Sequence, residues 1–290
     1  MTKENVLITG ASSGIGLELA RVFASHGHSL VLTAPVGAEL KRIAQEVEQA
    51  HGVSAHIIAQ DLTETGAPDK IFASAKEKIG AVDILVNNAG LGQRAKFWEY
   101  PFVSDREMIR VNIEAVVALT KLFLPQMQKR GQGRIMNTAS IAGFEPGPLL
   151  AVYHATKAFV LSFSEALAIE LEGSGITITA LCPGATDTDF FPKADMVQTK
   201  AFQKNKVMPP QVVAASGYEA VMRGDRVFVP GAMNKTLVFS RRFISLSAQA
   251  KVNQKFYEDT PPEKRKRHRG DIESASHRKQ RQRRLKRVRE

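Results

Sequence analysis

The feature that most constrains this chain is a short apolar strand that runs directly into a glycine-rich turn and then a helix. Residues 6–9 form the strand, Gly10, Gly14 and Gly16 punctuate the turn, and apolar helical periodicity continues to about residue 26. Glycines let a backbone approach a pyrophosphate closely, and a helix N-terminus directs N–H groups at it. A tight helix entry is the alternative interpretation, but the position directly after the first strand favours phosphate binding.

The rest of the chain repeats this alternation of strand and helix. We expect further strands at 29–33, 54–59, 82–86, 134–137, 176–181 and 227–230, with helices at about 38–50, 67–79, 104–129, 152–172 and 210–222. Strands separated by helices of this length predict βαβ units and a parallel sheet. The predicted fold class is therefore α/β, a doubly wound parallel sheet of seven strands in a single domain.

Charge divides the chain into a nearly neutral body and a basic tail. Residues 261–290 hold 13 Lys/Arg and 4 Asp/Glu, which leaves 27 basic and 25 acidic side chains in the first 260 residues. We predict one folded domain at 1–258 and a basic, flexible tail at 259–290. A solvated tail is the favoured interpretation, and contact with the phosphates of nucleic acid or anionic lipid is the alternative.

Two stretches after the sixth strand break the alternation. Residues 189–208 show no clear periodicity, which predicts a mobile lid over a cleft. From 235 to 246, apolar side chains alternate with Lys235, Arg241 and Arg242. We interpret this basic amphipathic segment as one that docks on its own domain or on a subunit, with membrane-surface contact as the alternative.

Composition also bears on the compartment. The chain does not open with a charged region followed by an apolar core, and no apolar run reaches the ~18 residues of a membrane-spanning helix. Cys182 is the only cysteine, which excludes an internal disulfide and fits a reducing compartment. We therefore expect a cytoplasmic protein, and we assign no metal ligand.

Tyr153 and Lys157 have the spacing that places two side chains one turn apart on the same helix face. A neighbouring ammonium favours the phenolate and predicts a pKa for Tyr153 below its usual value near ~10. Such a phenol can act as a general acid or base near neutral pH. Two other residues stay open on position alone: Asn112 is solvent-facing or functional, and Asp61 caps a turn or meets an adenine.

The ends of the predicted strands carry a set of short motifs in a definite order. They are T-G-A-S-S-G-I-G at 9–16, Asp61, N-N-A-G at 87–90, Asn112, Ser140, the Tyr153/Lys157 pair and P-G-A-T-D-T at 183–188. In this order and spacing the chain resembles the short-chain dehydrogenase/reductase family over about residues 3–230. The sequence around G-F-E-P-G-P and in the helix with Tyr153 most resembles the DltE-like bacterial branch of this family.

The resemblance implies a Rossmann fold with an NAD(P) cofactor along the strand ends. The pyrophosphate and adenosine ribose would lie against Gly10, Ser12, Ser13, Gly14, Ile15 and Gly16, and the adenine against Asp61 and Leu62. The rest of the cofactor would meet Asn88, Ala89, Gly90, Tyr153, Lys157, Pro183, Gly184, Thr186 and Thr188. After the second strand, Ala34 and Pro35 offer neither the acid of NAD-preferring members nor the arginine of NADP-preferring ones. We lean to NADP, because no acid there repels a 2′-phosphate.

The implied activity is the interconversion of a carbonyl and an alcohol by hydride transfer. Tyr153 would be the general acid or base, and Ser140 would hydrogen-bond the substrate oxygen as its charge develops. Lys157 would lower the tyrosine pKa and bind the ribose, and Asn112 would hold a water that relays the proton. The alternative function is a cofactor-binding regulatory or sensor protein whose basic tail binds an anionic partner.

The expected substrate is a small carbonyl or alcohol compound in an apolar cleft. Its binding residues would be Ser140, Phe144, Tyr153 and Phe190, with further walls from Leu91, Gly92, Phe97, Pro146 and Phe191. The resemblance also implies a homodimer or homotetramer that uses the two long helices, at about 104–129 and 152–172.

Overall fold

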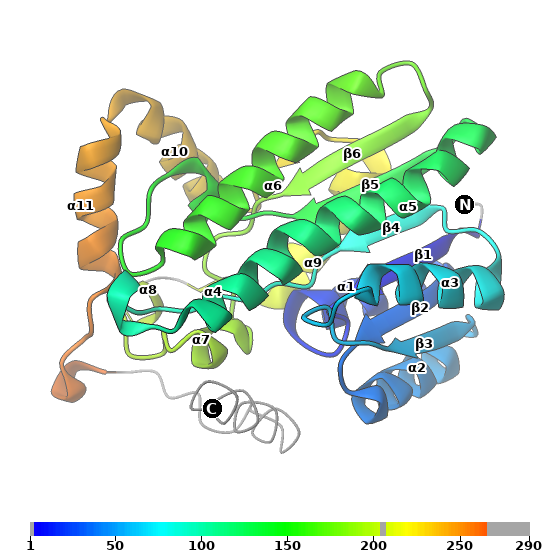
Figure 1. Ribbon diagram of the computed structural model, residues 1–290, viewed down its shortest axis with the longest axis horizontal. Coiled ribbons are helices and arrows are strands. Elements are labelled where there is room, and N and C mark those ends of the chain that lie inside the picture. The colour runs from blue at the N-terminus through cyan, green and yellow to red at the C-terminus, as the bar shows by residue number, and fades with distance from the viewer. Residues whose placement is uncertain (1–2, 204–206, 266–290) are drawn as a thin grey trace.

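One parallel sheet organises the protein. The computed structural model describes residues 3–203 and 207–265. Its seven strands lie in the order β3-β2-β1-β4-β5-β6-β7, and every neighbouring pair is parallel (Figure 1). The strands are β1 (Asn5–Thr9), β2 (Ser29–Ala34), β3 (Ala55–Ala59), β4 (Ile84–Asn87), β5 (Gly133–Thr138), β6 (Ile176–Leu181) and β7 (Val227–Phe228). The predicted α/β class and the doubly wound seven-stranded parallel sheet are confirmed.

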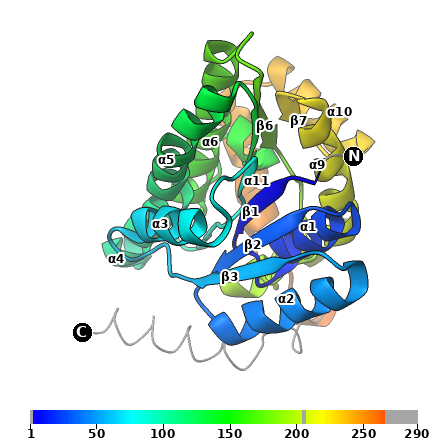
Figure 2. The same cartoon turned by 90° about the vertical axis from the view of Figure 1, so that its right-hand side faces the viewer.

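Helices cover both faces of the sheet (Figure 2). One face carries α1 (Gly14–Ser25), α2 (Gly37–His51) and α9 (Pro210–Arg223), and the other carries α3 (Ala67–Ile79), α5 (Ala115–Arg130) and α6 (Ala151–Glu170). Successive strand residues point to opposite faces, so Val6 and Ile8 of β1 join the first core and Leu7 joins the second. The strands β1, β2 and β4 are buried on both faces, which is why each contains an unbroken apolar run.

A chain of buried polar groups fixes the two central strands to the helices that cover them. The Asn87 side chain at the end of β4 donates to Asn137 Oδ1 on β5 at 2.9 Å, and Asn137 donates to Ser164 Oγ on α6 at 2.9 Å. All three residues are at most 3% exposed. Buried amides need partners, so this chain of bonds sets the position of α6 over β5.

The long helix expected at 104–129 is not one regular helix. It consists of α4 (Phe102–Ile109), a π-helical turn η2 (Arg110–Glu114) and α5. The Ala115 N–H donates to the Arg110 carbonyl, five residues back. A π-helical turn inside an α-helix frequently marks a functional site, and this one carries Asn112.

After β7 the chain forms two further helices at one end of the molecule (Figure 1). They are α10 (Ala232–Ser240) and α11 (Leu246–Tyr257), joined by the short helix η4 (Arg241–Phe243). The sequence predicts the amphipathic character of 235–246 but not α11. No helix among the described residues is long and apolar enough to cross a membrane.

The predicted lid contains two short helices, α7 (Phe190–Lys193) and α8 (Lys200–Gln203). It has a small apolar core of its own, in which Phe191, Met196 and Phe202 are at most 4% exposed. Its residues 204–206 lie outside the described part of the chain.

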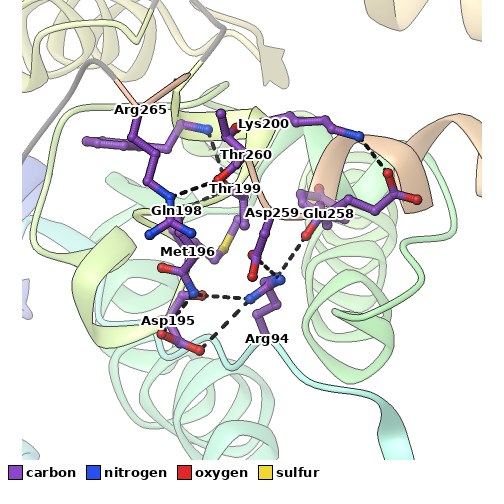
Figure 3. Close-up of polar contacts among 12 residues, drawn as sticks. Arg94, Asp195, Met196, Gln198, Thr199, Lys200, Glu258, Asp259, Thr260 and Arg265 are labelled. Carbon is purple, nitrogen blue, oxygen red and sulfur yellow. Dashed lines mark hydrogen bonds and ion pairs between the residues drawn. The ribbon is translucent and has the colours of Figure 1, made fainter. Parts of the chain in front are cut away.

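The start of the predicted tail packs against this lid (Figure 3). The Lys200 N–H donates to the Glu258 carbonyl at 3.0 Å, and the Thr260 N–H donates to the Gln198 carbonyl at 2.8 Å. Thr260 is 1% exposed. Residues 258–260 therefore run along the lid like an added strand, and the predicted tail beyond 265 lies outside the described residues.

Arg94 joins the lid and this C-terminal segment (Figure 3). Its guanidinium donates to the Tyr257 carbonyl at 2.8 Å, to the Asp195 carbonyl at 3.3 Å and to Asp259 Oδ1 at 2.5 Å. The Arg94 side chain is 14% exposed. A planar guanidinium can serve several acceptors at once, so Arg94 is the common anchor of three chain segments.

We predict that Arg94→Gln loosens the lid without unfolding the sheet. Loss of a largely buried charged anchor should speed amide hydrogen exchange at 195–200 by about tenfold, since local opening requires less free energy. Arg223→Gln is the matched control, because the Arg223 side chain is 53% exposed and its ion pair with Asp225 lies at the C-terminal end of α9. Unchanged exchange at 195–200 in Arg94→Gln would contradict the anchoring role.

Candidate active site

Three of the four predicted catalytic residues come together from separate elements. Ser140 follows β5 and opens the short helix η3 (Ile141–Phe144), while Tyr153 and Lys157 lie on the first turns of α6. The Ser140 side chain accepts the Ala142 N–H at 3.1 Å and donates to the Pro183 carbonyl at 3.4 Å. It therefore connects the ends of β5 and β6 beside Tyr153.

Lys157 carries a buried ammonium. Its side chain is 5% exposed, and Nζ donates to the Thr138 carbonyl at 2.7 Å. Burial lowers the pKa of Lys157 to about 8, because water no longer solvates the charge. A lysine with this pKa changes charge in a range where a proton-transfer site can use it.

The pKa of Tyr153 departs from the sequence-based expectation. Burial raises it to about 12, although a hydrogen bond with Ser140 acts in the opposite direction. The Lys157 ammonium lies 5.9 Å from the centre of the tyrosine ring and is bonded to the Thr138 carbonyl. The expected lowering by Lys157 is therefore wrong for this arrangement of side chains, in which desolvation outweighs the hydrogen bond with Ser140.

Asn112 braces the site through both ends of its amide. Its Oδ1 accepts the Leu91 N–H at 2.8 Å, and its Nδ2 donates to the Leu91 carbonyl and to Thr156 Oγ1, each at 2.9 Å. It is 1% exposed, so the solvent-facing interpretation is excluded. A Cβ added at Gly90 would lie 3.5 Å from Lys157 Nζ and 3.7 Å from Asn112 Oδ1, which places both groups around one glycine.

The glycine turn has the backbone that its sequence predicts. Gly10 and Gly14 have φ of +66° and +55°, which side chains rarely adopt. A Cβ on Gly16 would lie 2.2 Å from the Gly10 carbonyl oxygen. Only glycine fits these positions of the turn. The turn therefore brings the start of α1 against the end of β1.

The N-terminus of α1 is open toward the strand ends. Its N-cap, Ser13, makes no side-chain capping bond, and the first turn has no acidic residue. The first backbone N–H groups of a helix have no partner within it and carry its positive dipole end. Gly14 faces Thr188, since an added Cβ would lie 3.0 Å from that side chain. The residues at 10–16 and at 188 therefore fit a pyrophosphate.

The N-N-A-G motif ties three strand ends together. The backbone N–H groups of Asn88 and Ala89 donate to Thr9 Oγ1 at 2.9 and 3.0 Å. Asn88 Nδ2 donates to the Thr9 carbonyl at 3.1 Å, and Thr138 Oγ1 donates to Asn88 Oδ1 at 3.4 Å. The motif thus aligns the ends of β1, β4 and β5 along one edge of the sheet.

Asp61 caps the turn that follows β3, which is one of the two roles that the sequence leaves open. Its Oδ1 accepts the Thr63 N–H at 2.9 Å and the Thr63 hydroxyl at 2.8 Å. Leu62 is 7% exposed within the core that α3 and α5 cover. On the other side of the site, Thr186 donates to the Gly184 carbonyl at 3.0 Å.

The predicted substrate walls separate into three groups. The Phe190 ring lies 5.2 Å from that of Tyr153 and covers Gly92, where an added Cβ would lie 2.3 Å from it. Phe144 packs on the core beneath α6, and Phe191 faces the core of the lid. Phe97 is 66% exposed on the short helix η1 (Phe97–Glu99). Phe190 is therefore the aromatic wall that the structure brings to Tyr153.

The sequence does not predict that Glu39 and Arg42 lie near the glycine turn. A cavity of 540 Å³ above the turn is lined by Ser12, Ser13, Gly14, Leu17, Glu18, Glu39, Arg42, Asp187, Asp189, Val207, Pro209, Pro210 and Gln211. Glu39 and Arg42 lie on the first turns of α2, beyond the strand end where the choice of cofactor is normally read. The sequence feature that could have indicated their position is the short connection between β2 and α2, since α2 begins within three residues of the end of β2.

A second group beside the catalytic residues comes from the C-terminal helices. His154 Nε2 lies 2.9 Å from Tyr257 Oη, and His154 Nδ1 lies 2.8 Å from the Glu145 carbonyl. The Arg241 guanidinium forms an ion pair with Glu145 at 2.6 Å, with both side chains at most 10% exposed, and donates to the Ile141 carbonyl at 3.0 Å. Contacts across about a hundred residues have no local sequence signal.

The arrangement has the parts for proton transfer beside a bound dinucleotide. A phenol, a hydroxyl and a buried ammonium converge at the carboxyl ends of β5 and β6, at the same edge of the sheet as the N-terminus of α1. At that edge of a doubly wound sheet ligands characteristically bind.

Comparison with known proteins agrees with this geometry. The model of the family described as short chain dehydrogenase matches residues 4–198. The ketoacyl reductase HetN of Nostoc sp. is 34% identical over 184 residues, which are 63% of this chain and 64% of the relative. The chain thus spans about two thirds of that relative's length.

Solved structures share most of this architecture. A short-chain dehydrogenase from Sphingobium yanoikuyae in complex with NADPH has a TM-score of 0.74 and 32% identity, over 83% of this chain and 94% of that one. An alcohol dehydrogenase from Comamonas testosteroni, described as specific for bulky-bulky ketones, has a TM-score of 0.72 and 29% identity, over 84% and 93%. By sequence, fold and site, the chain belongs to the short-chain dehydrogenase/reductase family of oxidoreductases.

Proposed function

We propose that the protein interconverts a carbonyl compound and an alcohol with NAD(P), and that NADP is the preferred cofactor. The observation that carries the proposal is the convergence of Ser140, Tyr153 and Lys157 at the edge of the sheet where α1 begins. The relatives support the same class, since their descriptions name ketoacyl reduction and ketones as substrates and NADPH as a ligand.

The nicotinamide would supply the hydride in the reducing direction, and the protein would manage the proton. Tyr153 donates its hydroxyl proton to the substrate oxygen as charge develops there, and Ser140 hydrogen-bonds the same oxygen. The high pKa of Tyr153 keeps it protonated, which suits a proton donor. The positive charge of Lys157 stabilises the phenolate that remains, and this favours the product state.

Asn112 would act in two ways. Its hydrogen bonds to Leu91 and Thr156 hold the backbone beside Gly90 and the catalytic helix in one arrangement. A carbonyl oxygen has two lone pairs, and the bond from the Leu91 N–H uses one of them. The second is available for the water that would return a proton to Lys157.

The choice of cofactor would rest on Arg42 and Glu39. A 2′-phosphate carries negative charge, which Arg42 attracts and Glu39 repels. Both side chains line the cavity that contains Ser13. We infer that Arg42 takes the place of the basic residue that the end of β2 lacks.

The first test is Tyr153→Phe with Tyr218→Phe as its matched control. Loss of the hydroxyl should reduce turnover of a carbonyl substrate by at least about a thousandfold, because the proton donor is gone. Binding of NADPH, followed by its fluorescence, should remain. Tyr218 has its hydroxyl 3.3 Å from His28, away from the site, so its variant should keep its activity. Full turnover in Tyr153→Phe would show that the assigned mechanism is wrong.

The second test is the pH profile of carbonyl reduction. The pKa of Lys157 is about 8, so its ammonium is present below that pH and is lost above it, while Tyr153 stays protonated. We expect kcat/KM to be level below about pH 8 and to fall at higher pH. In Lys157→Arg the charge persists, so the decline near pH 8 should disappear. A decline at the same pH in this variant would assign it to another group.

The third test compares NADPH and NADH as cofactors. Arg42→Gln should raise KM for NADPH by about tenfold and leave KM for NADH nearly unchanged, since one charged contact to phosphate is lost. Lys41→Gln is the matched control, because it removes the same charge from the neighbouring position on α2. An equal rise of KM for NADPH and for NADH would show that Arg42 does not bind the 2′-phosphate.

A further inference from the structure

The C-terminal helices bury polar side chains and expose apolar ones. The buried residues of α11 are Gln249 and Asn253, and α10 has none. Gln249 Nε2 donates to the Arg241 carbonyl at 2.8 Å, and Asn253 Nδ2 donates to the Pro146 carbonyl at 2.8 Å. A helix that packs on its own domain normally does the reverse.

The segment formed by α10, η4 and α11 exposes many large apolar residues. Between residues 233 and 256 the exposed ones are Met233, Leu237, Phe239, Phe243, Ile244, Leu246, Val252 and Phe256. Phe243 is 78% exposed and Leu246 is 66% exposed. We call the eight residues the outer apolar surface. Many exposed apolar side chains on two successive helices indicate a surface that a membrane or another molecule covers.

The charges on α10, η4 and α11 themselves are of one sign. Residues 231–257 contain Lys235, Arg241, Arg242, Lys251 and Lys255 and no acidic residue. Arg241 turns inward to Glu145, whereas the other four are exposed. Among the described residues, Arg242 and Lys251 form no salt bridge. The surface is therefore complementary to a partner that is both apolar and anionic.

Two other occupants fit these charges poorly. Residues 266–290 of the same chain hold 11 Lys/Arg and 3 Asp/Glu, so they repel the surface and offer few apolar side chains. A second copy in a two-fold dimer would place the same cationic patch against itself. Like charges without acidic partners are unfavourable at an interface. Repulsion between like charges therefore argues against both the tail and a second copy as the occupant.

We propose that α10, η4 and α11 form a docking surface for an anionic lipid bilayer. The apolar side chains enter the boundary between headgroups and acyl chains, and Lys235, Arg242, Lys251 and Lys255 meet the lipid phosphates. The inward polar contacts hold the two helices on the body, so the surface is already formed before it meets the membrane. The protein binds at the membrane surface without crossing it.

The experiment is co-sedimentation of the full chain with vesicles. Phosphatidylcholine mixed with phosphatidylglycerol should bind the protein, and pure phosphatidylcholine should bind it much less. Phe243→Ser and Leu246→Ser should each weaken binding to the mixed vesicles by about tenfold. Lys251→Gln and Lys255→Gln should each weaken it by about fivefold.

Val212→Ser is the matched control, because Val212 is an exposed apolar residue on α9. It should bind vesicles like the unmodified chain. Equal binding by Phe243→Ser and the unmodified chain would overturn the proposal and assign lipid binding to the basic tail. A fall in oligomer size in Phe243→Ser, without any vesicle binding by the unmodified chain, would overturn it in favour of a second copy.

Discussion

The site depends on keeping one ammonium charged inside the protein. Removing a charge from water is unfavourable by several kcal/mol unless the fold supplies replacement partners. For Lys157 the Thr138 carbonyl is one such partner, at 2.7 Å. That carbonyl is the last of β5, and Asn137 beside it is bonded to α6 through Ser164. The distance between strand and helix is therefore set by buried hydrogen bonds, and the catalytic geometry follows from it.

Much of this geometry could be read from the sequence, because parallel strands all end at the same edge of the sheet. Once the strands at 6–9, 134–137 and 176–181 are recognised, the residues that follow each of them must lie near one another. The glycine turn is equally legible, since positive φ and close backbone approach both require glycine. Tyr153 and Lys157 could be paired from their helical spacing, and Ser140 could be added to them through the family resemblance.

Other parts depend on distances and burial that no local pattern records. The direction of the Tyr153 pKa follows from how completely its hydroxyl is desolvated, which the spacing to Lys157 does not reveal. Arg42 lies near the glycine turn only because α2 begins close to β2. In α11, Gln249 and Asn253 point inward because their side-chain amides donate hydrogen bonds to backbone carbonyls on other segments. Hydrophobic periodicity cannot detect a helix packed in this way.

The C-terminal helices connect the outer apolar surface to the active site through buried contacts. Arg241 binds Glu145 and the Ile141 carbonyl, and Tyr257 binds His154 beside Tyr153. These inward groups lie on the same helices as the exposed apolar residues but on other faces. Inward substitutions therefore disturb the loop after Ser140 as well as the helices, whereas outward ones leave that loop intact. The two faces can thus be separated by mutation, even though one pair of helices carries both.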